Sequence, residues 1–442
     1  MIRVTVLFAA WAGVASAEAL PQPLTDADFA PVRLDEAELG RLLFYDPILS
    51  GNRNVSCATC HHPRFGTSDG LSLGIGDGGI GLGPDRVADP DNPPEQRIPR
   101  NAPALFNLGA REVRVLFDDG RIEIDETRPS GFRTPLGTEM ESGFASLLSA
   151  QTMFPVLSAD EMAGHYSEND ISRSVRQGLI TGDGGAWDLL ARRVAEIPEY
   201  GERFEAVYGL APEDIHFTDI SNAIAAFVAW EWRSDTSPFD SFLRGEARLE
   251  PAAEAGMSLF YGALGCASCH SGPLLTDQDF HAMAAPQIGP GKAARFETHA
   301  RDEGRMRVTG DPADAYAFRT PSLRNVALTG PYGHAGAHAD LGTFIVAHAL
   351  PPMGLIEYDP SQLALPDLPV DDLRILRDTD AMAAIADASV RTMQDSPAGF
   401  GMLTPREVEA LVAFLESLTD PVAIEGRLGV PDAVPSGLPV ER

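Results

Sequence analysis

The sequence predicts a mainly α-helical protein of two domains that share a local sequence pattern. Its 442 residues exceed the roughly 100–200 residues of a usual domain, so two domains are expected. Apolar residues recur at helical spacing, and few segments alternate β-branched with polar residues as strands do. A short amphipathic segment followed by a cysteine pair occurs once in each half, which indicates an internal repeat. The 42 glycines and 35 prolines predict long irregular loops between the helices.

Residues 1–17 have the pattern of a secretory signal peptide. Arg3 precedes an apolar stretch, and the small residues Ala15 and Ala17 end it in the manner of a cleavage site. That stretch is too short to cross a bilayer, and no later segment reaches the roughly 18 apolar residues that a membrane helix needs. We therefore predict a chain without a membrane span that is exported to the periplasm through a cleaved signal peptide.

The net charge of −30 indicates which classes of binding partner are expected. Nucleic-acid binding depends on Lys and Arg side chains that neutralise phosphates, so this acidic chain is not expected to bind DNA or RNA. An acidic surface favours solubility and can steer a basic partner towards the protein.

All four cysteines belong to two C-x-x-C-H motifs. The motif residues are Cys57, Cys60 and His61 in the first half and Cys266, Cys269 and His270 in the second. In this motif the two thiols bond to the vinyl groups of a c-type haem and the histidine binds its iron. A four-thiolate zinc site normally has its cysteine pairs about 12–20 residues apart, and neither zinc nor a redox dithiol explains the two histidines. The sequence therefore predicts two covalently bound haem c groups, one in each of two cytochrome c-like domains.

The helices around the motifs set the predicted domain boundaries. Segments 40–45 and 256–261 each form a short amphipathic helix before a motif, and helices are predicted at 219–232 and 403–418. The last of these begins with Thr404 as N-cap and Glu407 completing a capping box. A helix break after Trp232 places the boundary near residue 245. The predicted units are a signal peptide at 1–17, domains at 18–245 and 246–425, and a tail at 426–442.

Longer stretches around these motifs resemble the bacterial dihaem cytochrome c peroxidases and the related dihaem enzymes that mature other proteins by oxidation. The matching stretches are LFYDPILSGNRNVSCATCH, RNAPALFN at 100–107, FDDGR at 117–121, SPFDSFLRG at 237–245 and FRTPSLRNVALTGPYGHAG at 318–336. The resemblance implies that the N-terminal haem reacts with hydrogen peroxide and that a six-coordinate C-terminal haem transfers electrons. It also implies a calcium ion between the haems, held by Asn101 and by the carbonyls of Thr329 and Pro331, which are suitable oxygen donors.

Two departures from the family pattern concern coordination of the irons. Classical members carry a histidine in an IGHG stretch that closes the peroxidatic haem, whereas this chain has Asp77 in the corresponding IGDG. We therefore expect a five-coordinate N-terminal haem that accepts peroxide in the resting ferric state. At the C-terminal haem, the family register from His334 places His348 where relatives have a methionine or tyrosine ligand. Met353 is the alternative ligand, and His348 is alternatively a buried core residue. A second imidazole would lower the haem potential relative to methionine.

A third departure is Asp118, which stands where family members typically have an aromatic residue between the haems. Electron exchange would then use Phe117 or no aromatic at all. By the family register, Glu161 is the general base and acid that moves protons during cleavage of the peroxide bond. The alternative is that Glu161 completes a capping box begun at Ser158.

These observations leave two hypotheses about function. The first is a peroxide-using dihaem oxidoreductase that takes electrons from a small donor protein or oxidises side chains of a partner protein. The second is a non-catalytic dihaem electron-transfer cytochrome, which would need both irons six-coordinate. Family peroxidases dimerise, so a homodimer is a further expectation.

Overall fold

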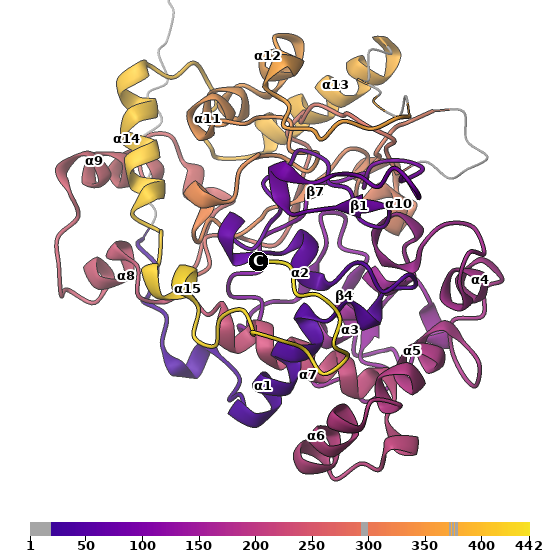
Figure 1. Cartoon of the computed structure of the whole chain (residues 1–442). Coiled ribbons are helices and arrows are strands. Elements are labelled where there is room, and N and C mark those ends of the chain that lie inside the picture. Colours follow the sequence, from indigo (N-terminus) through magenta and orange to yellow (C-terminus); the bar gives the residue numbers. More distant parts are fainter. Residues whose placement is uncertain (1–18, 293–298, 371–372, 374, 376–378) are drawn as a thin grey trace, which may run out of the picture.

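The computed structural model describes residues 19–292, 299–370, 373, 375 and 379–442 (Figure 1). The predicted signal peptide lies outside the described residues. The fold is mainly helical with three small antiparallel sheets, which confirms the predicted class. Among the described residues, no helix combines the length and the apolar character needed to cross a bilayer.

The first half is organised around two crossed helices, α1 (Leu34–Tyr45) and α7 (Phe217–Glu231). Gly40 allows them to touch, because a Cβ at Gly40 would lie 1.8 Å from the carbonyl oxygen of Ala223. Phe44 and Phe227 pack across this contact with ring centres 5.3 Å apart. The first cysteine pair forms the short helix α2 (Cys57–Cys60) beside α1.

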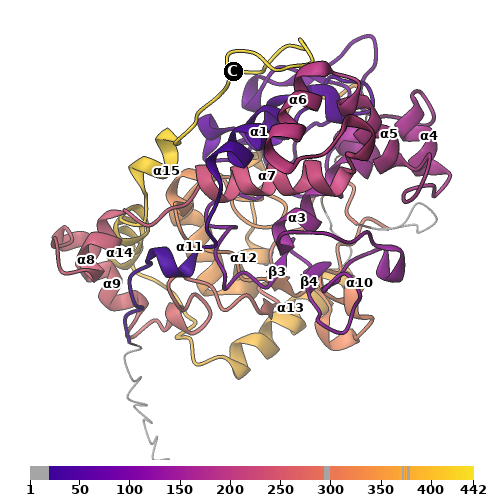
Figure 2. The same ribbon diagram turned by 90° about the horizontal axis from the view of Figure 1, so that it is seen from below.

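The second half repeats this crossing with α9 (Pro251–Phe260) and α14 (Pro405–Glu416). Here Gly256 makes the close approach, since its Cβ would lie 1.9 Å from the carbonyl oxygen of Ala410. Phe260 and Phe414 pack across the contact at 5.1 Å. Figure 2 shows the two crossings in separate parts of the molecule, α1 with α7 in the upper middle and α9 with α14 at the left edge.

Shorter elements surround the two crossings. The first half adds the helices α3 (Leu147–Thr152), α4 (Asp170–Arg176), α5 (Ala186–Ala195) and α6 (Pro198–Tyr208) and a π-helical turn at Ala159–Ala163. The second half adds α8 (Pro238–Leu243), α10 (Met306–Thr309), α11 (Leu341–Ala349), α12 (Pro351–Ile356), α13 (Thr379–Asp395) and α15 (Pro421–Glu425). The sheets pair β1 (Gly79–Ile80) with β2 (Val87–Ala88), β4 (Ile122–Ile124) with β3 (Val115–Leu116) and β5 (Phe132–Arg133), and β6 (Phe280–His281) with β7 (Phe318–Arg319).

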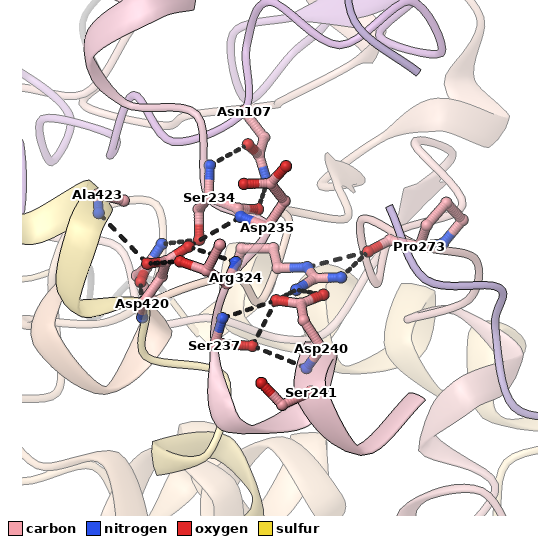
Figure 3. A network of polar contacts seen from close by, with 12 residues as sticks. Asn107, Ser234, Asp235, Ser237, Asp240, Ser241, Pro273, Arg324, Asp420 and Ala423 are labelled. Carbon is pink, nitrogen blue, oxygen red and sulfur yellow. Dashed lines mark hydrogen bonds and ion pairs between the residues drawn. The ribbon is translucent and has the colours of Figure 1, made fainter. Parts of the chain in front are cut away.

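Two asparagines in equivalent positions each join a loop of their own half to the chain segment just after helix α7 or α14. Asn107 and Asn325 both have positive φ angles, 58° and 61°. The Asn107 N–H donates to the carbonyl of Trp232 at 3.0 Å, and the Asn325 N–H donates to that of Leu418 at 3.2 Å. Figure 3 shows that the network around Asn107 continues to Asp420 and to a fully buried ion pair between Arg324 and Asp240. The same local device is therefore used twice.

The tail does not stay with the second half. Beyond α15 it runs back across α7 and ends beside α2, as the yellow trace of Figure 1 shows. Val434 is buried in the hydrophobic core of the first half, and Leu428, Val430 and Leu438 pack against that core. The core around α9 and α14 is a separate cluster. The predicted boundary near residue 245 falls between α8 and α9, and the domain division stays a prediction.

Candidate active site

The first C-x-x-C-H motif presents its side chains from a capped helical turn. Ser56 and Thr59 form a capping box around α2, and His61 is the C-cap residue. The His61 Nδ1 lies 3.0 Å from the carbonyl oxygen of Thr67, an acceptor that places the ring proton on Nδ1. Nε2 is then the atom left for a metal, which is the usual arrangement of an iron-binding histidine. Burial also lowers the pKa of His61, which favours the neutral ring.

The second motif has the same geometry. His270 Nδ1 lies 3.2 Å from the carbonyl oxygen of Leu275, and burial lowers its pKa in the same way. The four cysteines are free thiols rather than disulfide partners. Burial raises the pKa of the Cys57 thiol to about 12 and that of Cys266 to about 11. Each cysteine pair therefore lies in an apolar setting next to an oriented imidazole, which fits the covalent attachment of a haem.

A large cavity adjoins the second motif. It is lined largely by apolar side chains, with Cys266, Cys269 and His270 on one wall and His348 on another. An apolar cavity with two thiols and two imidazoles on its walls has the donors that a six-coordinate haem c requires. The residues present therefore fit the group that the motif implies.

His348 faces His270 across this cavity from helix α11. Their ring centres are 6.3 Å apart. Two imidazoles that bind one metal from opposite sides have ring centres about 6 Å apart, because each metal–nitrogen bond is about 2 Å and each centre lies about 1 Å behind its nitrogen. Burial lowers the pKa of His348 to about 3, which favours the neutral ring with one nitrogen unprotonated. The alternative Met353 lies on α12 with 40% of its surface exposed.

Glu161 lies in the π-helical turn at Ala159–Ala163, close enough to the first motif for its charge to act on the Cys60 thiol. Burial raises the pKa of its carboxyl group, and the nearby positive charge of Lys292 partly offsets this rise. The Ser158 side chain accepts no backbone hydrogen bond as an N-cap. A partly buried carboxyl group with a raised pKa is suited to exchanging protons.

The IGDG loop packs directly behind Glu161. The Asp77 N–H donates to the carbonyl of Glu161 at 3.0 Å. The Asp77 carboxylate points elsewhere and accepts from Asn52 Nδ2 at 3.1 Å on both oxygens. His165, four residues after Glu161, has its Nε2 3.9 Å from an Asp77 carboxylate oxygen. The loop thus contributes backbone support to Glu161 and an aspartate that is already hydrogen-bonded.

The three residues predicted to bind calcium line the wall of the large cavity. Asn101, Thr329 and Pro331 all face it. The Asn101 Nδ2 donates to the carbonyl of Leu71 at 2.7 Å, so its amide oxygen is the atom that remains for a cation. Carbonyl and amide oxygens suit calcium. The donor chemistry of these residues fits the ion, and calcium binding stays a prediction.

Asp118 also faces the cavity, and its carbonyl accepts the Arg319 N–H at 2.7 Å. An aromatic pair that sequence reasoning missed lies on the same wall. Phe318 and His334 stack with ring centres 3.9 Å apart and an interplanar angle of 12°. Sixteen positions separate them along the chain, so no local periodicity indicates the stack.

Arg100 joins the two halves through a buried ion-pair network, which sequence reasoning also missed. Its guanidinium donates to both oxygens of Asp302 at 2.7 and 2.8 Å and lies 2.9 Å from Asp119. Arg100 and Asp302 are separated by 202 positions. Burial disfavours the Asp302 carboxylate, but the charge of Arg100 outweighs it and holds the pKa of Asp302 far below its usual range.

Comparison with known proteins gives a consistent set of relatives. The family described as di-haem cytochrome c peroxidase matches residues 35–248. The methylamine utilization protein MauG of Methylorubrum extorquens is 30% identical over 324 residues, covering 72% of this chain and 69% of the relative. A cytochrome c551 peroxidase of Nitrosomonas europaea is 30% identical over 331 residues, covering 75% and 77%.

Solved structures give a similar picture. A MauG-like protein associated with microbial copper homeostasis superimposes with a TM-score of 0.57 at 26% identity, covering 92% of this chain and 95% of that one. The dihaem peroxidase BthA of Burkholderia thailandensis superimposes equally well, with a TM-score of 0.57 over 94% and 92% of the two chains. At 23% identity, this second likeness concerns the fold alone.

Proposed function

The chain belongs to the dihaem cytochrome c peroxidase family and is an oxidoreductase of the dihaem peroxidase type, and we propose that it reduces hydrogen peroxide at the haem of the first motif. In this proposal, the haem of the second motif is held on both faces and exchanges electrons with a partner protein. Family membership favours this enzyme over the passive electron carrier.

One observation carries the assignment of roles, namely the 6.3 Å separation of the His270 and His348 rings. His270 and His348 would together hold that haem, and an iron bound by two histidines is suited to electron exchange. The first motif instead has the partly buried acid Glu161 within electrostatic reach of Cys60, which suits it to peroxide. When bound, the haems would supply the redox chemistry.

The residues around the first haem then have separate tasks. His61, oriented by the carbonyl of Thr67, would hold the iron. The Glu161 carboxylate would accept a proton from one oxygen of hydrogen peroxide and return it to the other, which leaves as water. The overall change is H2O2 + 2 e⁻ + 2 H⁺ → 2 H2O. The two electrons come either from a small donor protein or from a side chain of a partner protein, which is oxidised in the process.

Ligation of the second haem by His348 favours the partner-oxidation role. A second imidazole lowers the haem potential relative to a methionine ligand, so the haem is a poorer acceptor for electrons from a high-potential cytochrome. It is better suited to sharing oxidising equivalents. The relatives include both a cytochrome c551 peroxidase and the methylamine utilization protein MauG.

Peroxide consumption by the purified holoprotein tests the proposal. We expect rapid loss of added H2O2, with two reduced cytochromes oxidised per peroxide if the donor role holds. Peroxide consumption with slow cytochrome turnover would assign the partner-oxidation role instead. A holoprotein that carries both haems and leaves peroxide untouched would refute the enzymatic proposal.

We propose in addition that the chain is periplasmic and binds one calcium ion. The location is supported by the signal pattern of residues 1–17 and by covalent haem attachment. The ion is supported by the oxygen donors of Asn101, Thr329 and Pro331, which line the same cavity. Elemental analysis of dialysed protein should give one calcium per chain, and a value near zero would remove calcium from the proposal.

A further inference from the structure

The C-terminal tail makes a polar contact with the first haem site that none of the motifs indicates. The Glu441 carboxylate accepts a hydrogen bond from the Thr59 hydroxyl and lies 3.3 Å from the Arg86 guanidinium. Thr59 is buried between the two cysteines of the first motif. The tail therefore reaches the haem-attachment turn with a charged group rather than with apolar side chains alone.

Arg86 is one of the most deeply buried large side chains, with 2% of its surface exposed. Its guanidinium donates to three backbone carbonyls, those of Ile75 at 2.6 Å, Gly76 at 2.7 Å and Gly81 at 2.5 Å. These carbonyls belong to the IGDG loop and the β1 hairpin, which Arg86 therefore holds as a clamp. The clamp also requires a glycine at position 79, because a Cβ on Gly79 would lie 2.5 Å from Arg86 Nε.

A buried guanidinium needs a counter-charge, since an unpaired charge away from water is costly. Glu441 is the carboxylate in ion-pair contact with Arg86. Asp69 is also within electrostatic reach, but burial raises its pKa to about 7, which weakens it as a counter-charge near neutral pH. Glu441 thus anchors the clamp, with its side chain 22% exposed and therefore open to substitution.

The clamped loop is in turn the backbone support of Glu161. Gly76 lies flat against it, because a Cβ at Gly76 would be 2.7 Å from the Glu161 Cα. The next residue, Asp77, donates its N–H to the Glu161 carbonyl at 3.0 Å. Contacts therefore run without a gap from the tail to Arg86, to the loop and to the residue proposed to move the protons.

From this path we propose that Glu441 and Arg86 are positioning residues for the peroxide reaction. By bonding both Thr59 and Arg86, the Glu441 carboxylate fixes the haem-attachment turn relative to the loop behind Glu161. The loop is then held in one place, and Glu161 stays in register with bound peroxide. This inference rests on the proposed function, because it gives Glu161 its proton-transfer role.

The test compares Glu441→Gln with Asp432→Asn in the haem-loaded protein. Both changes remove one negative charge from the same tail, but Asp432 forms its ion pair with the exposed Arg442 at the surface. We expect Glu441→Gln to slow the reaction of ferric protein with H2O2 by roughly ten- to a hundredfold, as expected for a displaced catalytic group. Asp432→Asn should leave the rate unchanged.

Hydrogen exchange of residues 75–81 supplies a readout independent of catalysis. Loss of a charge-assisted contact should speed exchange of these amides about tenfold in Glu441→Gln, with no change in Asp432→Asn. Arg86→Lys serves as the second variant, because a lysine keeps the charge but cannot hold three carbonyls in one planar arrangement. It should show the same faster exchange in this loop.

The outcomes separate the two proposals. Unchanged loop exchange and an unchanged peroxide rate in Glu441→Gln would overturn the positioning role, as would a lower melting temperature with both readouts unaltered. A wild-type holoprotein that ignores peroxide would instead refute the proposed function. In that case faster loop exchange in Glu441→Gln would still support the clamp, and unchanged exchange would still refute it.

Discussion

The two halves of the chain form one side of each haem site, the side with the C-x-x-C-H motif, in the same way. We call this the bonded side. They form the opposite, open side differently. On the bonded side, His61 and His270 each direct Nδ1 to a backbone carbonyl five or six residues later. Gly40 and Gly256 permit equally close helix crossings, with hypothetical Cβ atoms 1.8 and 1.9 Å from a carbonyl oxygen. These shared parts are short and lie near each motif or its crossing helices.

The open sides come from segments that have no counterpart in the other half. In the second half, helix α11 brings His348 opposite His270. In the first half, a π-helical turn and the clamped IGDG loop carry the partly buried Glu161. Under the proposed assignment, the comparison teaches that a repeated scaffold would attach the cofactor, whereas the segments inserted between its helices would decide whether an iron reacts or only transfers electrons.

The largest expected effect is a loss of peroxide reactivity at the first haem site, which would remove its difference from the second. Glu161→Gln should slow the reaction with peroxide by roughly 10²–10⁴-fold, the usual contribution of a positioned proton-transfer group. Both haems should remain attached, because no motif residue changes. Stopped-flow mixing of ferric protein with H2O2 measures the rate. Glu199→Gln, an exposed change on α6, is the matched control; equal rates in the two variants would remove Glu161 from the mechanism.

The next effect tests the shared scaffold. Gly40→Ala and Gly256→Ala should each cost about 3 kcal/mol or more of unfolding free energy, because the added methyl group meets backbone that cannot move aside easily. The two losses should be similar, since the two contacts have nearly the same geometry. Gly401→Ala is the control, as a Cβ there meets no atom within 4 Å. Denaturant unfolding gives the unfolding free energies. A loss of stability in only one of the two variants would show that the crossings are not equivalent.

A smaller effect concerns the second open side. His348→Met should raise the reduction potential of one haem by on the order of 0.1 V and leave the other nearly unchanged, because methionine ligation favours the ferrous state. Spectroelectrochemical titration resolves the two potentials. Met353→Leu should shift neither one. The opposite pattern, with a shift in Met353→Leu alone, would make Met353 the ligand.

The smallest effect is a pH dependence that should appear on the first side only. Burial raises the pKa of Glu161, and the carboxylate that accepts the proton exists above this raised value. The peroxide rate should therefore be constant above it and fall towards tenfold per pH unit below it. The spectrum of the second haem should stay constant over the same range. A wild-type profile identical to that of Glu161→Gln would contradict the assignment.

Much of the bonded side could be predicted from the sequence because it is local. The helix predicted at 219–232 is α7, and the capping box predicted at Thr404 begins α14 as expected. A spacing of three or four residues is enough to indicate such features. The alternative for Glu161 was that it completes a capping box begun at Ser158. The segment is a π-helical turn in which the Ser158 side chain accepts no capping bond from the backbone but hydrogen-bonds the Glu161 carboxyl group.

The contacts that join distant segments could not be predicted in this way. Arg86 and Glu441 are 355 positions apart, and Arg100 and Asp302 are 202 apart. Neither pair follows a helical or strand period. From the sequence alone, charged residues at those positions are equally consistent with exposure to solvent and with a buried ion pair. Only the folded path of the chain brings them together, which is why the role of the tail was not expected.

Electron paramagnetic resonance of the ferric holoprotein tests the central claim most directly. The account predicts two signals of equal intensity, a high-spin signal from the haem at His61 and a low-spin signal of bis-imidazole type from the haem between His270 and His348. Adding H2O2 should remove the high-spin signal on the time scale of the reaction with peroxide. Two low-spin signals that do not respond to peroxide would contradict the proposed division of labour between the halves.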